Sequence, residues 1–215
     1  KSYQELYTWS VSNIPAFWAS VWDFVEVKAS KNYDRVVEDL SVFPGTKWFP
    51  GARLNFAENL LRYRDEHIAF IFVGETQRKA TLTYAEVYDT VGQLAKSLRN
   101  IGIAPGDRVA AYMPNMMETA IAMLAATSIG ATWASCATDI GPEGVLDRLG
   151  QIEPKVLFTV DGYFHKGKAF STVSNAAEIV KRMPSVKQVV VASYTGTKAD
   201  ISLVPNAIYF EDFLS

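Results

Sequence analysis

The sequence of 215 residues is poor in the side chains that build disulfide frameworks and metal sites, with one cysteine and two histidines. Cys136 alone cannot form an internal disulfide, and a small buried thiol is the simplest interpretation of it. His67 and His165 lie far apart, without a companion carboxylate at metal-ligand spacing. We therefore expect no metal site and a surface or packed imidazole at each histidine.

Long hydrophobic runs and an excess of one charge are also missing. No apolar stretch approaches the ~18 residues of a membrane span, and no signal-peptide pattern opens the chain, which favours a reducing, cytoplasmic setting. The 21 Lys and Arg residues and the 23 Asp and Glu residues leave a net charge of −2. No overall basic field can therefore attract nucleic acid or anionic lipid, and we expect neither as a partner.

Two glycine-rich nucleotide motifs are absent as well. No G-x-G-x-x-G follows a predicted strand and no G-x-x-x-x-G-K-[ST] occurs, which argues against a dinucleotide-dependent oxidoreductase and a P-loop NTPase. The first residue is not Met, and the closing "FEDFLS" stops where an amphipathic segment begins. We therefore expect a fragment of a longer protein.

From residue 67 onward the hydrophobic pattern is regular. A hairpin is predicted over "HIAFIFVGE" and "KATLTY", followed by a helix from about 83 to 100. Short apolar strands then alternate with helices: strands 108–112, 131–134, 156–160 and 188–192, and helices 116–129, 142–152 and 171–183. This alternation indicates an α/β fold with a mainly parallel sheet flanked by helices, whose ligand should bind at the C-terminal ends of the strands.

Residues 1–66 have a different composition, with four of the five tryptophans. Asn13 and Pro15 predict the start of a helix, and a second helix is expected to be capped near Asn55. Apolar side chains recur at helical spacing in the first helix and predict a core-facing stripe: Phe17, Trp18, Val21, Trp22 and Val25. We interpret this segment as an aromatic-rich helical extension.

The stretch "KSLRNIGIAPGDRVAAYMPN", residues 96–115, changes its structure three times. Gly102 allows the left-handed conformation that ends a helix, and Pro105-Gly106-Asp107 is typical of a turn. Pro114 cannot donate a hydrogen bond to a sheet. The stretch therefore predicts the end of a helix, a turn, a short strand and a stop.

Taken together, these segments resemble the adenylate-forming acyl-CoA synthetase family. The segment "LTYAEVYDTVGQLAKSLRNIGIAPGDRVAAYMPN", followed in register by "AMLAATSIGATWA", resembles its early "TY" strand and helix, "G-x-x-x-G-D-x-V" turn and "MPN". "KWFPGARLNFAENLL" resembles the extension of the acetate- and acetoacetate-activating branch, and residues 134–163 and 205–215 resemble the acetoacetate-activating members more closely. The resemblance implies an extension over 1–66 and the first part of an AMP-binding domain over 67–215.

Enzymes of this family join a carboxylate to AMP with ATP and Mg²⁺, release pyrophosphate, and let the CoA thiol displace AMP. The resemblance implies acetoacetate, ATP and CoA as small-molecule partners of the full-length protein, with no cofactor bound to the fragment. It implies no catalytic residue here, because the phosphate loop, the ribose-binding acid and the catalytic lysine are not recognisable. "SYTGTK", residues 193–198, lacks the second glycine and the Pro-Lys of the phosphate loop.

The residues that the resemblance brings to CoA lie in two places. Cys136, Asp139 and Gly141 belong to a loop expected beside the pantetheine path, and Lys166 and Lys168 are expected near the CoA phosphates. The loop leads into a helix N-terminus, which can receive an anion, although it also fits a plain strand-to-helix connection. The lysines also fit a solvated edge, and they lack the bidentate geometry of the arginines that the family often has there.

Three interpretations of the whole chain stay open at this point. The first is the N-terminal portion of an acetoacetate-activating ligase that is inactive as an isolated fragment. The second is a ligase for acetate or another short-chain acid. The third, from another class, is a non-enzymatic α/β scaffold or binding module that has kept the fold of such an enzyme.

Overall fold

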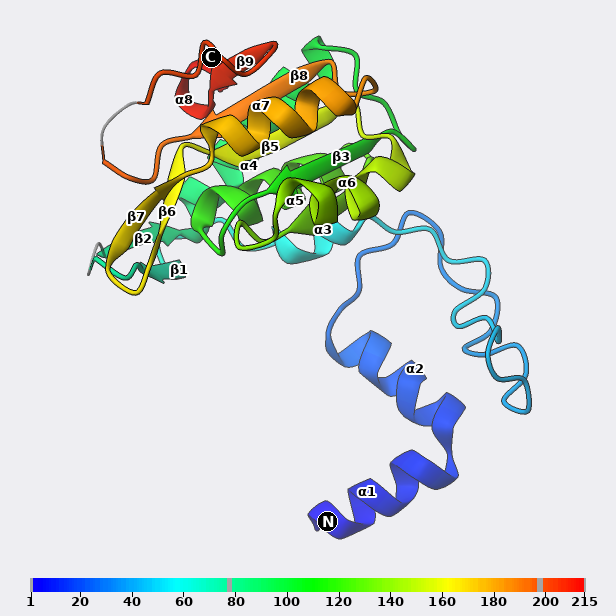
Figure 1. Cartoon of the computed structure of the whole chain (residues 1–215). Coiled ribbons are helices and arrows are strands. Elements are labelled where there is room, and N and C mark those ends of the chain that lie inside the picture. Colours follow the sequence, from blue (N-terminus) through cyan, green and yellow to red (C-terminus); the bar gives the residue numbers. More distant parts are fainter. Residues whose placement is uncertain (1, 77–78, 197–198, 215) are drawn as a thin grey trace. The chain divides into compact units, whose positions relative to one another are not determined.

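The computed structural model describes residues 2–76, 79–196 and 199–214. The chain divides into two compact units, Lys1–Leu60 and Leu61–Ser215 (Figure 1). The first unit is helical and irregular, and the second contains the sheets.

In residues 2–60, the described part of the first unit, the helices are α1 (Tyr3–Ser12), α2 (Ile14–Phe24) and α3 (Phe56–Leu60). The sequence pattern does not predict α1, which begins with a capping box between Ser2 and Glu5. The predicted start of α2 at Asn13 is confirmed, although the Asn13 side chain makes no capping hydrogen bond. The predicted cap of α3 is confirmed, because the Asn55 side chain accepts a hydrogen bond from the Glu58 N–H at 3.1 Å.

The apolar stripe of α2 does not form a buried core, so that expectation is corrected. Trp18 is 41% exposed and Val25 40%, and no residue of α2 is fully buried. The rings pack instead on the loop that follows, with centroid distances of 6.1 Å for Trp18 and Trp48 and 4.8 Å for Trp22 and Phe49. These ring-to-ring contacts with an irregular loop leave the rings partly exposed, since a loop does not cover a helix face as a second layer of helices or strands does.

The second unit is built on a five-stranded sheet in which every neighbouring pair is parallel, in the order β4-β3-β5-β8-β9. Its strands are β3 (Arg108–Tyr112), β4 (Thr132–Cys136), β5 (Val156–Val160), β8 (Gln188–Ala192) and β9 (Ala207–Tyr209). Two antiparallel hairpins accompany it: β1 (Ile68–Val73) with β2 (Lys79–Thr83), and β6 (Gly162–His165) with β7 (Lys168–Ser171). The prediction of a mainly parallel α/β sheet flanked by helices is confirmed.

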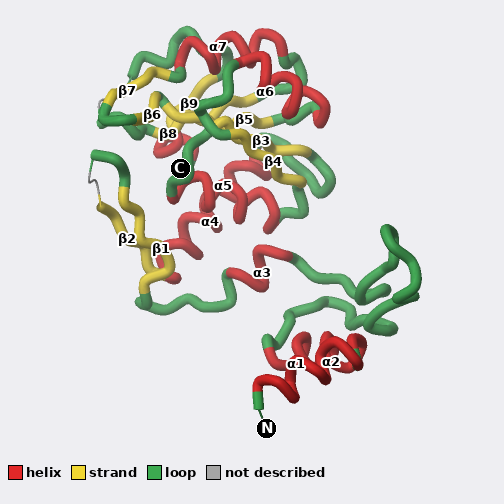
Figure 2. Tube along the Cα trace, turned by 60° about the horizontal axis from the view of Figure 1, so that its bottom comes forward, coloured by secondary structure: helices red, strands yellow, loops and turns green. Residues whose placement is uncertain are grey.

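Helices cover both faces of this sheet. They are α4 (Tyr84–Asn100), α5 (Met117–Ser128), α6 (Pro142–Leu149) with the 3₁₀ turn η1 (Gly150–Ile152), α7 (Val173–Arg182) and the short α8 (Phe210–Phe213). Figure 2 shows α6 and α7 on one side of the strands and α4 and α5 on the other. Ala110 and Tyr112 of β3 join the cluster under α6 and α7, whereas Val109 and Ala111 alternate to the opposite face, fully buried.

The predicted end of α4 is confirmed in detail. Gly102 has a φ of +84°, and the N–H groups of Gly102 and Ile103 bond to the carbonyls of Arg99 and Leu98 at 2.9 and 3.0 Å. This is the Schellman arrangement, which satisfies carbonyls at the end of a helix. Elsewhere the predicted boundaries need small corrections: β4 ends at Cys136 rather than 134, and the helix from Pro142 tightens into η1 after Leu149.

Candidate functional site

The C-terminal ends of the strands are organised around Tyr112, the last residue of β3. Its side chain is fully buried, and its hydroxyl lies 3.0 Å from the carbonyl oxygens of both Thr138 and Ile140, which share its single proton. These carbonyls belong to the loop between β4 and α6. Tyr112 therefore holds in place the loop that the sequence singled out.

Side chains from the loop, from β6 and from α7 affect the pKa of the Tyr112 hydroxyl. Burial raises the pKa of Tyr112 above its ordinary value, while a hydrogen bond with the Asn175 side chain opposes this. Tyr163 of β6 and Asp139 of the loop add to the increase in pKa. The phenol therefore stays a hydrogen-bond donor at neutral pH, close to both the loop and the β6–β7 hairpin.

The three loop candidates differ in their exposure. Asp139 is exposed in a turn, and Gly141 is the exposed residue that precedes α6, with an extended backbone and no side chain to cap the helix. Cys136 is only 7% exposed and belongs to the core cluster under α6 and α7. Burial raises the pKa of the Cys136 thiol, against the opposing effect of Arg148. Cys136 is thus a buried thiol, and a CoA contact for these three residues stays a prediction.

The two lysines lie on the β6–β7 hairpin, which the sequence pattern does not predict. Lys166 and Gly167 form its two-residue turn with φ angles of +51° and +74°, and Lys168 begins β7 opposite His165. All four residues are exposed. The hairpin therefore presents two lysines and a histidine at its end. His165 is a surface imidazole, one of the two expected outcomes. It lies close to the lysines because it directly precedes the turn and pairs with Lys168 across the hairpin.

One acidic side chain reaches the end of this hairpin. The Glu75 carboxylate, from the segment after β1, accepts a hydrogen bond from the Gly167 N–H at 3.1 Å. No ion pair joins Lys166 or Lys168 to any residue in the described ranges. A backbone N–H beside two lysines is a favourable environment for an anion, here the Glu75 carboxylate.

A groove of 410 Å³ lies elsewhere in the second unit, beside the edge strand β4. It is lined by residues of β1, the start of α5 and β4: Phe70, Ile71, Phe72, Asn115, Met116, Met117, Thr119, Ala120, Met123, Trp133 and Ser135. The lining is mainly apolar, and no titratable side chain contributes to it. It therefore offers shape for an apolar group but no acid–base chemistry.

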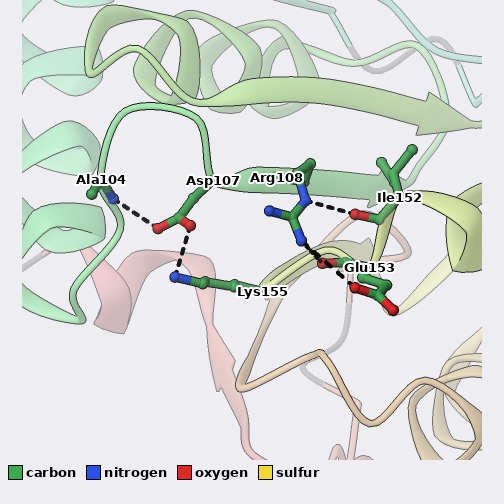
Figure 3. A network of polar contacts seen from close by, with 6 residues as sticks. All are labelled: Ala104, Asp107, Arg108, Ile152, Glu153 and Lys155. Atoms are coloured by element: carbon green, nitrogen blue, oxygen red, sulfur yellow. Dashed lines mark hydrogen bonds and ion pairs between the residues drawn. The ribbon is translucent and has the colours of Figure 1, made fainter.

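The opposite end of the sheet carries a separate network of polar contacts (Figure 3). Asp107, just before β3, bonds to the Lys155 ammonium at 2.7 Å and to the Ala104 N–H at 3.0 Å. The pKa of Asp107 is lowered, chiefly by the Lys155 bond and then by the Ala104 N–H. Arg108 donates to the carbonyl of Ile152 at 2.7 Å. These contacts join the N-terminal ends of β3 and β5 and lie at the far end of the strands from the hairpin.

The described part of the chain lacks two features, a cluster of metal-ligating side chains and a membrane-spanning helix. Within residues 2–76, 79–196 and 199–214, no three His, Cys, Asp or Glu residues gather closely enough to hold a metal ion. In the same ranges, no helix is both long and apolar enough to cross a membrane.

Comparison with known proteins gives two family matches, one to the N-terminal part of the chain and one to most of the rest. The family described as "AMP-binding enzyme" matches residues 56–207, which include four strands of the parallel sheet and the first residue of β9. The chain belongs to the AMP-binding enzyme family. A second match, described as "Acetyl-coenzyme A synthetase N-terminus", covers residues 3–60. The boundary that the sequence suggests at residue 66 stays a proposal.

Individual relatives agree with this placement. The chain is 41% identical to an acetoacetyl-CoA synthetase from Xenopus tropicalis, with 100% of the chain and 33% of the relative aligned. It is 40% identical to an acetoacetyl-coenzyme A synthetase from Rhizobium meliloti (strain 1021), with 99% and 32% aligned. A solved acetoacetyl-CoA synthetase from Streptomyces lividans matches with a TM-score of 0.90 and 39% identity, over 100% of this chain and 33% of that one. The chain spans about one third of the length of the relatives it matches.

Proposed function

We propose that the chain is the N-terminal portion of an ATP-dependent acetoacetate–CoA ligase. In this reaction ATP converts the carboxylate into an acyl-AMP with release of pyrophosphate, and the CoA thiol then displaces AMP. The observation that carries the proposal is the similarity at about 40% identity to acetoacetyl-CoA synthetases across the whole chain. Identity spread over both units supports a shared reaction more strongly than a shared fold alone would.

The contribution of this chain is to the binding of CoA. Lys166 and Lys168 project from an exposed hairpin beyond the end of β5, and the loop with Asp139 and Gly141 follows the end of β4. Both lie at the C-terminal ends of parallel strands, where ligands of such sheets bind. We assign the phosphates of CoA to the lysines and the pantetheine arm to the loop, with Cys136 packed beneath it.

The adenylation chemistry belongs to groups that are not recognisable in this chain. A triphosphate needs a glycine- and hydroxyl-rich loop with a lysine, the ribose needs an acid, and the reaction needs a movable lysine. Mg²⁺ accompanies ATP in the proposed reaction, but the described residues offer no acidic cluster that fits it. We therefore assign no step of adenylation to residues of this chain, and we expect the 215-residue chain to be inactive by itself.

Acetoacetate-dependent exchange of pyrophosphate into ATP tests the proposal. Acetate and butyrate serve as comparison acids, and both the full-length ligase and the 215-residue chain are assayed. We expect exchange with acetoacetate by the full-length protein and none by the chain, because loss of even one electrostatic catalytic group commonly costs on the order of 10²–10³ in rate. Exchange by the 215-residue chain would contradict its assignment as an inactive portion. A preference of the full-length protein for acetate would contradict the choice of acid.

A further inference from the structure

Asp161, the residue directly after β5, carries a carboxylate that none of the roles above uses. It is 1% exposed. One carboxylate oxygen accepts hydrogen bonds from the N–H groups of Tyr194 at 2.8 Å and Thr195 at 3.2 Å, and the other accepts from the Thr195 hydroxyl at 3.1 Å. Burying a carboxylate is costly unless hydrogen bonds compensate for the lost water, and here three do so.

The backbone of Asp161 joins two further segments. Its N–H bonds to the carbonyl of Ala192 at the end of β8, at 3.0 Å. Its carbonyl accepts from the N–H of Thr172, the fully buried residue that closes the base of the β6–β7 hairpin, at 3.2 Å. One residue therefore connects the end of β5, the base of the hairpin and the turn after β8.

The turn held by the Asp161 carboxylate in turn supports the side of the hairpin. The Tyr194 ring packs edge-on against Phe164 of β6 at 5.7 Å and against Phe72 of β1 at 6.0 Å. At Gly162, an added Cβ would come within 2.8 Å of the Thr195 side chain and 2.5 Å of the Phe170 carbonyl. The base of the hairpin and the turn are therefore in close contact, with no room for a side chain at Gly162.

We propose that Asp161 is a positioning residue for CoA: it holds the turn after β8, and through it the β6–β7 hairpin, so that Lys166 and Lys168 meet the CoA phosphates. The inference rests on the proposed function. Asp161 itself touches no substrate. Its carboxylate acts through Tyr194 and Thr195, and its effect belongs to the second half of the reaction, in which CoA takes part.

The test compares the two half-reactions in the full-length ligase with three variants. Asp161→Ala removes all three carboxylate bonds. Asp161→Asn keeps the shape and an oxygen that can accept the two N–H bonds, so it is the conservative variant. Tyr194→Ala leaves the Asp161 carboxylate in place and removes the ring between Phe164 and Phe72. Asp200→Ala is the control, because its exposed carboxylate, bonded to the Ser202 N–H at 2.9 Å, comes from the same connection between β8 and β9.

We expect Asp161→Ala and Tyr194→Ala to raise the KM for CoA by about three- to tenfold, which is no more than the loss of both lysine contacts would cause, because misplacement weakens each contact without removing it. Acetoacetate-dependent ATP–pyrophosphate exchange should stay within about twofold of wild type, and Asp161→Asn and Asp200→Ala should show little change in either assay. A purely structural role would reduce the amount of active enzyme, lowering both half-reactions together and leaving the KM for CoA unchanged.

Equal losses in both half-reactions with an unchanged KM for CoA would overturn the inference. This holds for Tyr194→Ala and for any Asp161 variant that folds, and the proposed function would still stand. If Asp161→Ala does not fold, Tyr194→Ala still decides between the two patterns. A wild-type enzyme without acetoacetate-dependent exchange would overturn the proposed function, and the positioning role with it.

Discussion

The two ends of the parallel sheet hold their strands together in different ways. At the N-terminal ends, charged side chains pair with one another, as Asp107 does with Lys155. At the C-terminal ends, neutral groups donate the hydrogen bonds that connect the segments: the Tyr112 hydroxyl bonds to the loop after β4, and backbone N–H groups bond to Asp161. Lys166 and Lys168, at the hairpin, form no ion pair within the described ranges. The comparison teaches that a charge is balanced by an opposite charge at one end, whereas at the other end the buried Asp161 carboxylate is balanced by neutral donors alone.

The largest expected effect comes from Phe158, in the middle of β5 between the two ends. It is fully buried and contacts Trp133 and Phe210. Phe158→Ala should lower the free energy of unfolding by about 3–5 kcal/mol, because it leaves a cavity in a close-packed interior. Urea unfolding of the chain measures this loss. A loss below about 1 kcal/mol would contradict the close packing of the Phe158 ring in the middle of the sheet.

The next effect concerns the charged end. Asp107→Asn should cost about 1–2 kcal/mol at neutral pH, because it removes a charge-assisted hydrogen bond from a side chain that is 13% exposed. The pKa of Asp107 is lowered in the folded state, so this stabilisation is fully present above the unfolded pKa of about 3.9 and is lost as pH falls through the folded value. The difference between wild type and variant should therefore shrink below about pH 4. Urea unfolding at both pH values checks it, and a constant difference would contradict it.

At the other end, Tyr112→Phe removes the hydroxyl that bonds to Thr138 and Ile140 without changing the ring. We expect a loss of about 1 kcal/mol in stability, since two carbonyl groups lose a donor. Because the loop with Asp139 and Gly141 loses its anchor, the KM for CoA of the full-length ligase should also rise. An unchanged KM would show that the loop does not meet CoA, and Phe158→Leu provides the control for a packing change alone.

The smallest effect on stability is expected from the hairpin lysines. Lys166→Ala with Lys168→Ala should leave the free energy of unfolding within about 0.5 kcal/mol, because both are exposed. The KM for CoA should rise roughly three- to thirtyfold, given ~0.3–1 kcal/mol for each exposed charge contact. Lys187→Ala, just before β8 at the opposite end of the sheet, is the matched control and should leave KM unchanged. An equal rise in the KM for CoA in the double variant and in Lys187→Ala would contradict a specific role of the hairpin lysines in CoA binding.

The sequence predicted much of this fold because its signals are local and periodic. Strands β3, β5 and β8 have the predicted bounds, and each is an apolar run buried on both faces. The β6–β7 hairpin was missed because its strands have four residues each and β7 is exposed throughout, so no hydrophobic period marks it. For the candidate site, the resemblance pointed to Lys166 and Lys168, but their place at the end of a hairpin came from the structure.

The sequence by itself determined the alternation of strands and helices, the left-handed end of α4 at Gly102, and the motifs that mark the AMP-binding enzyme family. Each of these depends on residues within one or two turns of the chain. Tertiary structure alone decided that the Asp161 carboxylate bonds to Tyr194 and Thr195, which lie 33 and 34 residues away. The physical reason is that a buried carboxylate takes whatever donors the packed sheet brings to it. Those donors are present because β5 and β8 are neighbours in the sheet, and no local sequence pattern indicates that pairing.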